Sequence, residues 1–248
     1  MRVGVLGGSG TAGSQAVAAL ERRGHEVRVL TRSTGLDVTT GAGLDISLAG
    51  LDTLVDCLGV QRATERAARP VLVDGLRSTL ERAAHLGVGH VVSLSILNCD
   101  RIPMSYYRTK LAQEEVIRTA PLPGTVLRAT QFPQLLNQAW RAMRSTGIIA
   151  APNGLLSPLD PRDVGDHLAD AVEAGPHGPP LLALCGPQDL QIRDAAHAWR
   201  AANRSRRPVV PLPVVGGALR ALAAGLFVDQ GVPRGTRTFA SWLEENRT

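Results

Sequence analysis

Two tyrosines and the single lysine of the chain lie within one short segment, Tyr106-Tyr107-Arg108-Thr109-Lys110. Tyr106 and Lys110 are four residues apart, so on a helix their side chains share one face. A lysine ammonium beside a phenol favours the phenolate, lowers the tyrosine pKa and makes the phenol a usable general acid or base. The other basic residues are all arginine, and a planar guanidinium cannot replace a compact ammonium in a tight site. The spacing therefore predicts a catalytic Tyr106–Lys110 pair, with Tyr107 as a rival phenol.

Ser95 is the third candidate for this chemistry. It ends the apolar run His90–Ser95, which is typical of a buried strand. A hydroxyl at that strand end could bind the same reacting oxygen as the tyrosine. The alternative is a surface helix over 106–119 whose tyrosine only packs under its neighbours.

A glycine-rich turn near the start of the chain predicts an anion site. It joins an apolar strand, Val3–Leu6, to an apolar-periodic helix, Ser14–Arg23. Small residues let the backbone approach a pyrophosphate, and the free N–H groups and dipole of the helix favour its charge. The alternative is a tight strand–helix turn without a ligand. The predicted cofactor residues here are Gly7, Ser9, Gly10, Thr11, Ala12 and Gly13.

The end of the second strand, His25–Leu30, bears on the choice of cofactor. An acidic residue there would bind the adenosine ribose and exclude a 2′-phosphate, but this chain has Arg32 and Ser33. An arginine with hydroxyl neighbours suits a phosphate, so NADP(H) is favoured over NAD(H). The alternative is an ordinary surface arginine.

The elements that must position these residues alternate between strand and helix. This alternation predicts an α/β fold with a doubly wound, parallel, Rossmann-like sheet in a single domain, residues 1–248. Residues from about 134 onward are expected to add a small substrate lobe. Further strands are predicted at 36–39, 51–59, 125–128, 148–150 and 181–185, and helices at 44–48, 65–86, 106–119, 134–145, 160–172, 193–203, 216–227 and 238–246.

Composition excludes several classes of function. The net charge is +5, but the arginines are dispersed and aromatic residues make up only 3% of the chain, which argues against a nucleic-acid surface. The apolar stretch 209–228 contains two prolines and an arginine, which argues against a membrane span. Three distant cysteines and unpaired histidines predict no disulfide framework and no metal site. With no leader-like start, these features favour a cytoplasmic protein.

Taken together, the glycine turn, Arg32, Ser95 and Tyr106-x-x-x-Lys110 resemble the short-chain dehydrogenase/reductase superfamily. Four segments point to its NmrA-like branch, which includes NADP-dependent quinone and dye reductases and non-catalytic cofactor sensors. They are residues 27–32, the Glu114-Glu115 pair that follows Lys110, residues 125–132 and residues 158–164.

The resemblance implies roles for further residues. Asp37 and Val38 would lie at the adenine, Leu58 and Gly59 at a ribose, and Lys110 on the nicotinamide ribose. Thr130, with its neighbours 129–132, would border the nicotinamide. Tyr106 would donate the proton and Ser95 would orient the substrate. The chain departs from the typical pattern at Cys57-Leu58-Gly59, where such enzymes have Asn-Ala-Gly, and in its short loop between Ser95 and Tyr106.

These features predict an NADP(H)-dependent reductase acting on a small carbonyl, quinone or enone, with Tyr106 as proton donor. A cofactor-sensing protein without turnover is the main alternative. An epimerase or isomerase is a weaker one, because the chain is short for a sugar-nucleotide lobe. The substrate, and assembly into a homo-oligomer, are left open by the sequence.

Overall fold

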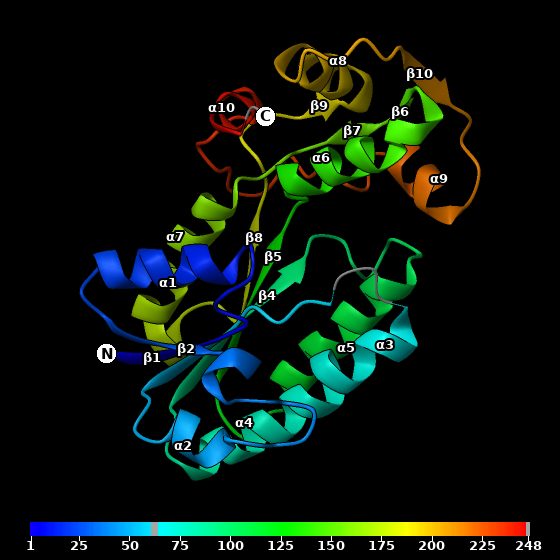
Figure 1. Ribbon diagram of the computed structural model, residues 1–248. Coiled ribbons are helices and arrows are strands. Elements are labelled where there is room, and N and C mark those ends of the chain that lie inside the picture. The colour runs from blue at the N-terminus through cyan, green and yellow to red at the C-terminus, as the bar shows by residue number, and fades with distance from the viewer. Residues whose placement is uncertain (61–63, 247–248) are drawn as a thin grey trace.

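A six-stranded parallel sheet forms the centre of the protein. The computed structural model describes residues 1–60 and 64–246. The strand order is β2-β1-β3-β4-β5-β8, and every neighbouring pair is parallel (Figure 1). The predicted doubly wound α/β fold is confirmed. The strands are β1 (Arg2–Leu6), β2 (Glu26–Leu30), β3 (Thr53–Asp56), β4 (His90–Ile96), β5 (Gly124–Ala129) and β8 (Leu181–Leu184).

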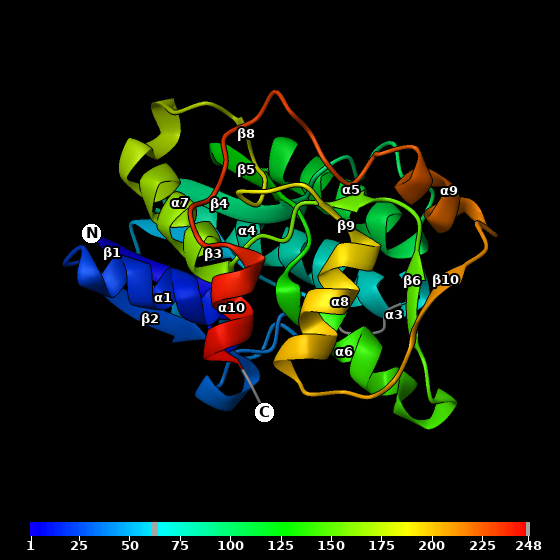
Figure 2. The ribbon, with the colours of Figure 1, turned by 90° about the horizontal axis from the view of Figure 1, so that it is seen from above.

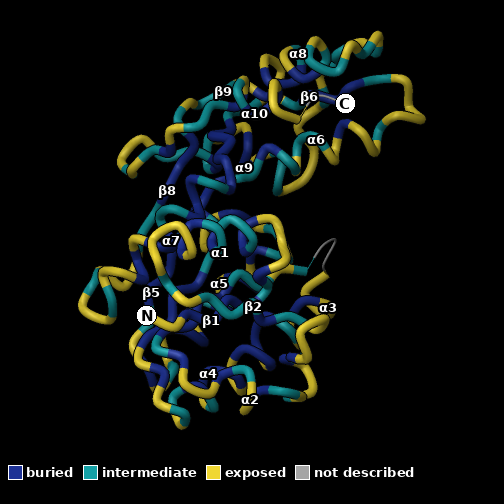
Figure 3. The backbone as a smooth tube through the Cα atoms, turned by 60° about the vertical axis from the view of Figure 1, so that its left-hand side comes forward, coloured by how far each residue is buried: buried dark blue, intermediate teal, exposed yellow. Residues whose placement is uncertain are grey.

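The sheet is covered on both faces, so its central strands β3 and β4 are almost wholly buried. Helices α1 (Gly13–Arg22) and α7 (Pro161–Ala174) pack on one face. Helices α2 (Leu44–Leu48), α3 (Glu65–Arg69), α4 (Leu76–His85) and α5 (Ser105–Arg118) cover the other (Figure 1). In Figure 3 buried residues gather in the interior, and exposed residues lie on the outer sides of the helices and on the loops.

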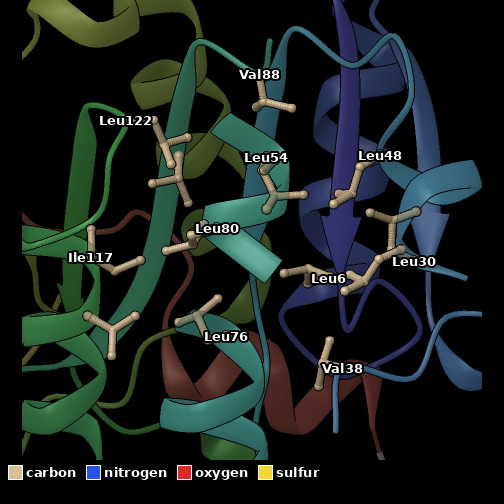
Figure 4. Close-up of a cluster of buried hydrophobic side chains, with 14 of the residues drawn as sticks. Leu6, Leu30, Val38, Leu48, Leu54, Leu76, Leu80, Val88, Ile117 and Leu122 are labelled. Carbon is tan, nitrogen blue, oxygen red and sulfur yellow. The ribbon is translucent and has the colours of Figure 1, made fainter. Parts of the chain in front are cut away.

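Each face has its own hydrophobic core. On the α4–α5 face, leucines from β1, β2 and β3 meet Leu76 and Leu80 of α4 and Ile117 of α5 (Figure 4). On the opposite face, α1 and α7 approach closely because small residues line their contact. A Cβ on Gly165 of α7 would lie only 2.5 Å from the carbonyl oxygen of Gln15 in α1.

Apart from α7 and β8, the helices and strands after β5 form a lobe at one end of the sheet, with a separate aromatic core that includes Trp140, Trp199 and Trp242. Seen from above in Figure 2, β6 and β10 run side by side in this lobe as a parallel pair. The lobe contains α6 (Pro133–Ala142), β6 (Ile149–Pro152), β7 (Leu155–Leu156), β9 (Leu190–Gln191), α8 (Ile192–Ala202), β10 (Val209–Leu212), α9 (Gly217–Ala223) and α10 (Phe239–Glu245).

Three local predictions were wrong. Residues 36–39 form no strand and contribute only an isolated bridge between Asp37 and Ala42. The helix predicted over 65–86 is interrupted by a π-helical segment, Pro70–Gly75, between α3 and α4. There Gly75 lies against Val38, since a Cβ would meet its carbonyl oxygen at 2.5 Å. The helix predicted over 216–227 is only Gly217–Ala223. The strand predicted at 148–150 corresponds to β6, but its partner β10 and the two-residue strands β7 and β9 were missed because they are too short to show a period.

His90, at the start of β4, makes the stability of this fold depend on pH. Its side chain is 2% exposed, its Nε2 lies 3.1 Å from Thr125 Oγ1, and burial lowers its pKa. The unfolded chain takes up a proton near the ordinary histidine pKa of about 6.5, whereas the folded protein does so only at lower pH. Stability is therefore complete above about pH 6.5 and decreases as the pH falls below it.

We expect wild-type protein to lose more unfolding free energy than His90→Gln between about pH 7 and pH 5, because only the wild type has this buried imidazole to protonate. The glutamine keeps a polar partner for Thr125 but does not titrate. Urea unfolding of both proteins at each pH measures the difference. Parallel pH dependences would contradict the assignment.

Candidate functional site

The glycine turn lies where the strand order reverses. Strand β1 pairs with β2 on one side and β3 on the other, so the crevice beyond its carboxyl end is the position at which open α/β sheets bind ligands. Gly7 has φ +68° and donates its N–H to Leu30 O at 3.0 Å. A Cβ at Gly7 would meet Cys57 O at 2.8 Å, so the turns after β1 and β3 are in backbone contact.

Gly13 begins α1 directly against this turn. A Cβ on it would lie 2.2 Å from Gly7 O, a contact with rigid backbone. Between them Ser9, Gly10 and Thr11 are exposed, and the N-cap Ala12 makes no side-chain cap. No acidic residue lies in the first turn of α1. The exposed backbone and the uncapped helix end fit a pyrophosphate, which both the N–H groups and the helix dipole attract.

The predicted 2′-phosphate residues lie at the end of β2. Arg32 and Ser33 are exposed in a single 3₁₀ turn, Arg32–Thr34. The pKa of Asp37 is lowered mainly by the hydrogen bond from the Thr39 hydroxyl, and the positive charge of Arg32 makes a smaller contribution. Val38 is buried next to it.

Tyr106 lies against the loop that follows β3. A Cβ on Gly59 would be 3.8 Å from its hydroxyl oxygen, and the N–H of Val60 donates to that hydroxyl. Burial is the main cause that raises the pKa of Tyr106, and the carboxylate of Asp56 raises it further. The phenol therefore keeps its proton at neutral pH. We expected Lys110 to lower this pKa, and in the structure the direction is the opposite.

Tyr107 has a different environment. Its ring is 5% exposed and lies 6.2 Å from the ring of Phe227, and its hydroxyl accepts a hydrogen bond from Gln131 at 3.4 Å. Burial raises its pKa to about 12. Tyr107 therefore belongs to the core of the lobe, whereas Tyr106 borders the crevice.

Lys110 lies one turn beyond Tyr106 on α5 and is 4% exposed. Its Nζ donates to the carbonyl of Leu94 in β4 at 2.6 Å. Burial lowers its pKa, while the negative field of Asp56 opposes that change. The ammonium is therefore buried between α5 and β4.

Ser95 is directed toward an ion pair. Its hydroxyl donates to Glu114 of α5, whose carboxylate also receives Arg128 at 2.7 Å and the Cys99 thiol at 3.3 Å. Ser95 is 4% exposed. The structure thus brings Tyr106 and Lys110 onto one helix at the sheet edge, while the described contacts of Ser95 are with the Glu114–Arg128 pair.

Leu58 and Thr130 make hydrogen bonds that fix loops at the carboxyl edge of the sheet. The N–H of Leu58 donates to Asp56 at 3.0 Å, which fixes the loop after β3. Thr130 is buried, and its hydroxyl donates to Ser157 O at 2.6 Å and accepts from the N–H of Gly186 at 3.1 Å. Its side chain joins three segments rather than facing open space.

Sequence reasoning missed Asp56, a fully buried carboxylate at the end of β3. A signal was available, because a lone acid within the apolar run Leu54-Val55-Asp56-Cys57 requires partners. It also gave no role to the Glu114–Arg128 pair, whose residues lie on different elements, α5 and β5. Within residues 1–60 and 64–246, no cluster of three or more His, Cys, Asp or Glu side chains could hold a metal ion. No helix of the same residues has the length and apolar character needed to cross a bilayer.

Comparison with known proteins identifies the fold. Neither a protein-family model nor a curated protein matches the sequence. Among solved structures, an NADPH-dependent quinone oxidoreductase from Escherichia coli, complexed with NADPH, has a TM-score of 0.75 at 16% identity, over 98% of this chain and 99% of that one. Triphenylmethane reductase from Citrobacter sp. has a TM-score of 0.74 at 15% identity, covering 99% and 100%. A nucleoside-diphosphate-sugar epimerase from Staphylococcus aureus has the same TM-score and identity, covering 98% and 100%. The chain therefore has the fold of these three proteins over nearly its whole length.

The contact between Gly13 and Gly7 can be tested directly. Gly13→Ala places a methyl group against backbone, so we expect a loss of about 1–3 kcal/mol in unfolding free energy. We also expect NADPH binding, measured by nucleotide fluorescence, to weaken more than about tenfold, the affinity equivalent of 1.4 kcal/mol. Gly89→Ala is the matched control, because its Cβ meets only Asp52 O at 3.7 Å. Wild-type affinity in Gly13→Ala would contradict the pyrophosphate site.

Proposed function

We propose that this protein is an NADP(H)-dependent reductase of the short-chain dehydrogenase/reductase type, acting on a carbonyl, quinone or enone small molecule. The observation that carries the proposal is the position of Tyr106. Its protonated hydroxyl lies against the Gly59–Val60 loop, beside the glycine turn at the switch point of the sheet, with Lys110 one helical turn away.

The candidate residues have separate roles in cofactor binding and in proton transfer. The turn from Gly7 to Gly13 binds the pyrophosphate, and Arg32 with Ser33 binds the 2′-phosphate. NADPH supplies the hydride when it is bound. Tyr106 donates its proton to the oxygen on which negative charge develops, and its raised pKa keeps that proton available at neutral pH. Lys110 holds the ribose from beneath.

The proton donor has a direct test. Tyr106→Phe is expected to lower kcat for NADPH oxidation at least about 100-fold, because general acid catalysis contributes about that much. NADPH affinity should change little, since the ring is kept. Tyr107→Phe is the matched control and should keep turnover near the wild-type rate. Loss of turnover in Tyr107→Phe alone would show that the wrong phenol was chosen.

Cofactor preference is decided at Arg32. Arg32→Ala should weaken NADPH binding about tenfold or more, the loss of one charge-assisted contact, and leave NADH binding unchanged. Arg77→Ala, an exposed arginine on α4, is the control and should affect neither cofactor. Equal losses for NADPH and NADH in Arg32→Ala would overturn the phosphate assignment.

One observation favours a second candidate, a cofactor sensor without turnover. Ser95 donates its hydroxyl to Glu114, so the serine predicted to orient the substrate oxygen is engaged elsewhere. NADPH oxidation against a panel of quinones, enones and aromatic ketones separates the two. Turnover that disappears in Tyr106→Phe establishes the reductase, whereas tight NADPH binding without turnover supports the sensor.

A further inference from the structure

The carboxylate of Asp56 is the hydrogen-bond hub of the site. It is 0% exposed and accepts three hydrogen bonds: from Ser93 Oγ at 2.8 Å, from Gln113 Nε2 at 2.5 Å and from the N–H of Leu58 at 3.0 Å. All three of these described partners are hydrogen-bond donors, and a carboxylate oxygen accepts from each. Burial of a carboxylate costs free energy that its hydrogen bonds must offset, so a functional reason for keeping Asp56 here is expected.

Its partners come from the segments that present the candidate residues. Leu58 lies in the loop that continues to Gly59 and Val60, against Tyr106. Ser93 pairs with Asp56 across the β3–β4 ladder and precedes Leu94, whose carbonyl accepts Lys110. Gln113 lies on α5, three residues after Lys110.

The charges around Lys110 leave Asp56 as its available counterion. Cys57, Cys99 and the carboxylates of Asp56 and Glu114 face the ammonium. Glu114 is already engaged by Arg128 in a two-point ion pair. No Arg or Lys within 4 Å of Asp56 forms an ion pair with it in the described part of the chain, so its charge acts on Lys110 through space. The charge of Asp56 raises the pKa of Tyr106, and Tyr106 in turn contributes to the raised pKa of Tyr107.

We propose that Asp56 is a positioning residue that joins the loop after β3, strand β4 and helix α5 and supplies the countercharge of buried Lys110. Its catalytic meaning rests on the proposed reductase function, while its effect on Lys110 does not. Burial lowers the pKa of Lys110, and the charge of Asp56 opposes this change. Burial is the main cause that raises the pKa of Tyr106, and the charge of Asp56 adds to it, which suits a proton donor in reduction.

The composition of the chain makes a direct test practical. Because Lys110 is the only lysine, protein labelled with carbon-13 at lysine Cε gives a single side-chain NMR signal whose titration belongs to this residue. Asp56→Asn removes the charge at nearly constant shape. Gln113 Oε1 has no described partner, so its amide can turn and accept from the new asparagine. The control, Ser93→Ala, removes one hydrogen bond from Asp56 but no charge.

In cofactor-free protein, we expect Asp56→Asn to move the Lys110 titration to lower pH by about one unit, as removal of one nearby opposite charge does. Ser93→Ala should titrate like the wild type. An unchanged Lys110 titration in Asp56→Asn, or an equal shift in Ser93→Ala, would overturn the proposal. If Asp56→Asn does not fold, Asp56→Ser removes the same charge in a smaller side chain and is judged by the same criterion.

Activity adds a second readout. In a turning-over enzyme, the alkaline limb of the kcat/KM profile for NADPH should move with the Lys110 titration in Asp56→Asn and stay in place in Ser93→Ala. An NMR shift without a shift of that limb would refute the positioning role. If the wild type turns over no substrate, the reductase assignment fails while the Lys110 titration still decides the electrostatic one.

Discussion

The structure depends on a close backbone contact at the switch point of the sheet. The first residue of α1 lies on the carbonyl of Gly7, and Gly7 in turn lies on the carbonyl of Cys57, with no room for a Cβ at either place. These two contacts bring the turns after β1 and β3 together and direct the N-terminus of α1 across the crevice. Arg32 follows β2 and Thr130 follows β5, so both lie beyond the carboxyl ends of parallel strands of the same sheet.

Behind the crevice, α5 meets the sheet through charge as well as apolar packing. Lys110, Gln113 and Glu114 all point from this helix toward β3, β4 and β5, where they meet Leu94 O, Asp56 and Arg128. Buried polar groups are stable only when their partners are in place, so this layer fixes the position of α5 along the strands. The position of Tyr106 follows, because it lies on the same helix one turn before Lys110.

Helix α7 and the end of the chain hold the lobe to the sheet. Asp163, in the first turn of α7, accepts the N–H groups of Thr236 and Arg237 at 2.9 and 3.0 Å. Cys185, just after β8, exchanges backbone hydrogen bonds with Pro233 and Gly235. The carboxyl edge of the sheet is therefore bordered by a segment more than 200 residues away in sequence from the glycine turn.

The sequence by itself determined the alternation of strands and helices. Buried parallel strands appear as short apolar runs, and amphipathic helices appear as apolar residues at helical spacing. The sequence also determined the glycine turn and the shared helix face of Tyr106 and Lys110, which follow from spacing along one element. Only the tertiary structure decided what Ser95 contacts, that the charge of Asp56 acts on Lys110, and that burial raises rather than lowers the pKa of Tyr106. The reason is physical: pKa values and hydrogen-bond partners depend on burial and on charges from other elements, and the spacing of residues along one helix contains neither.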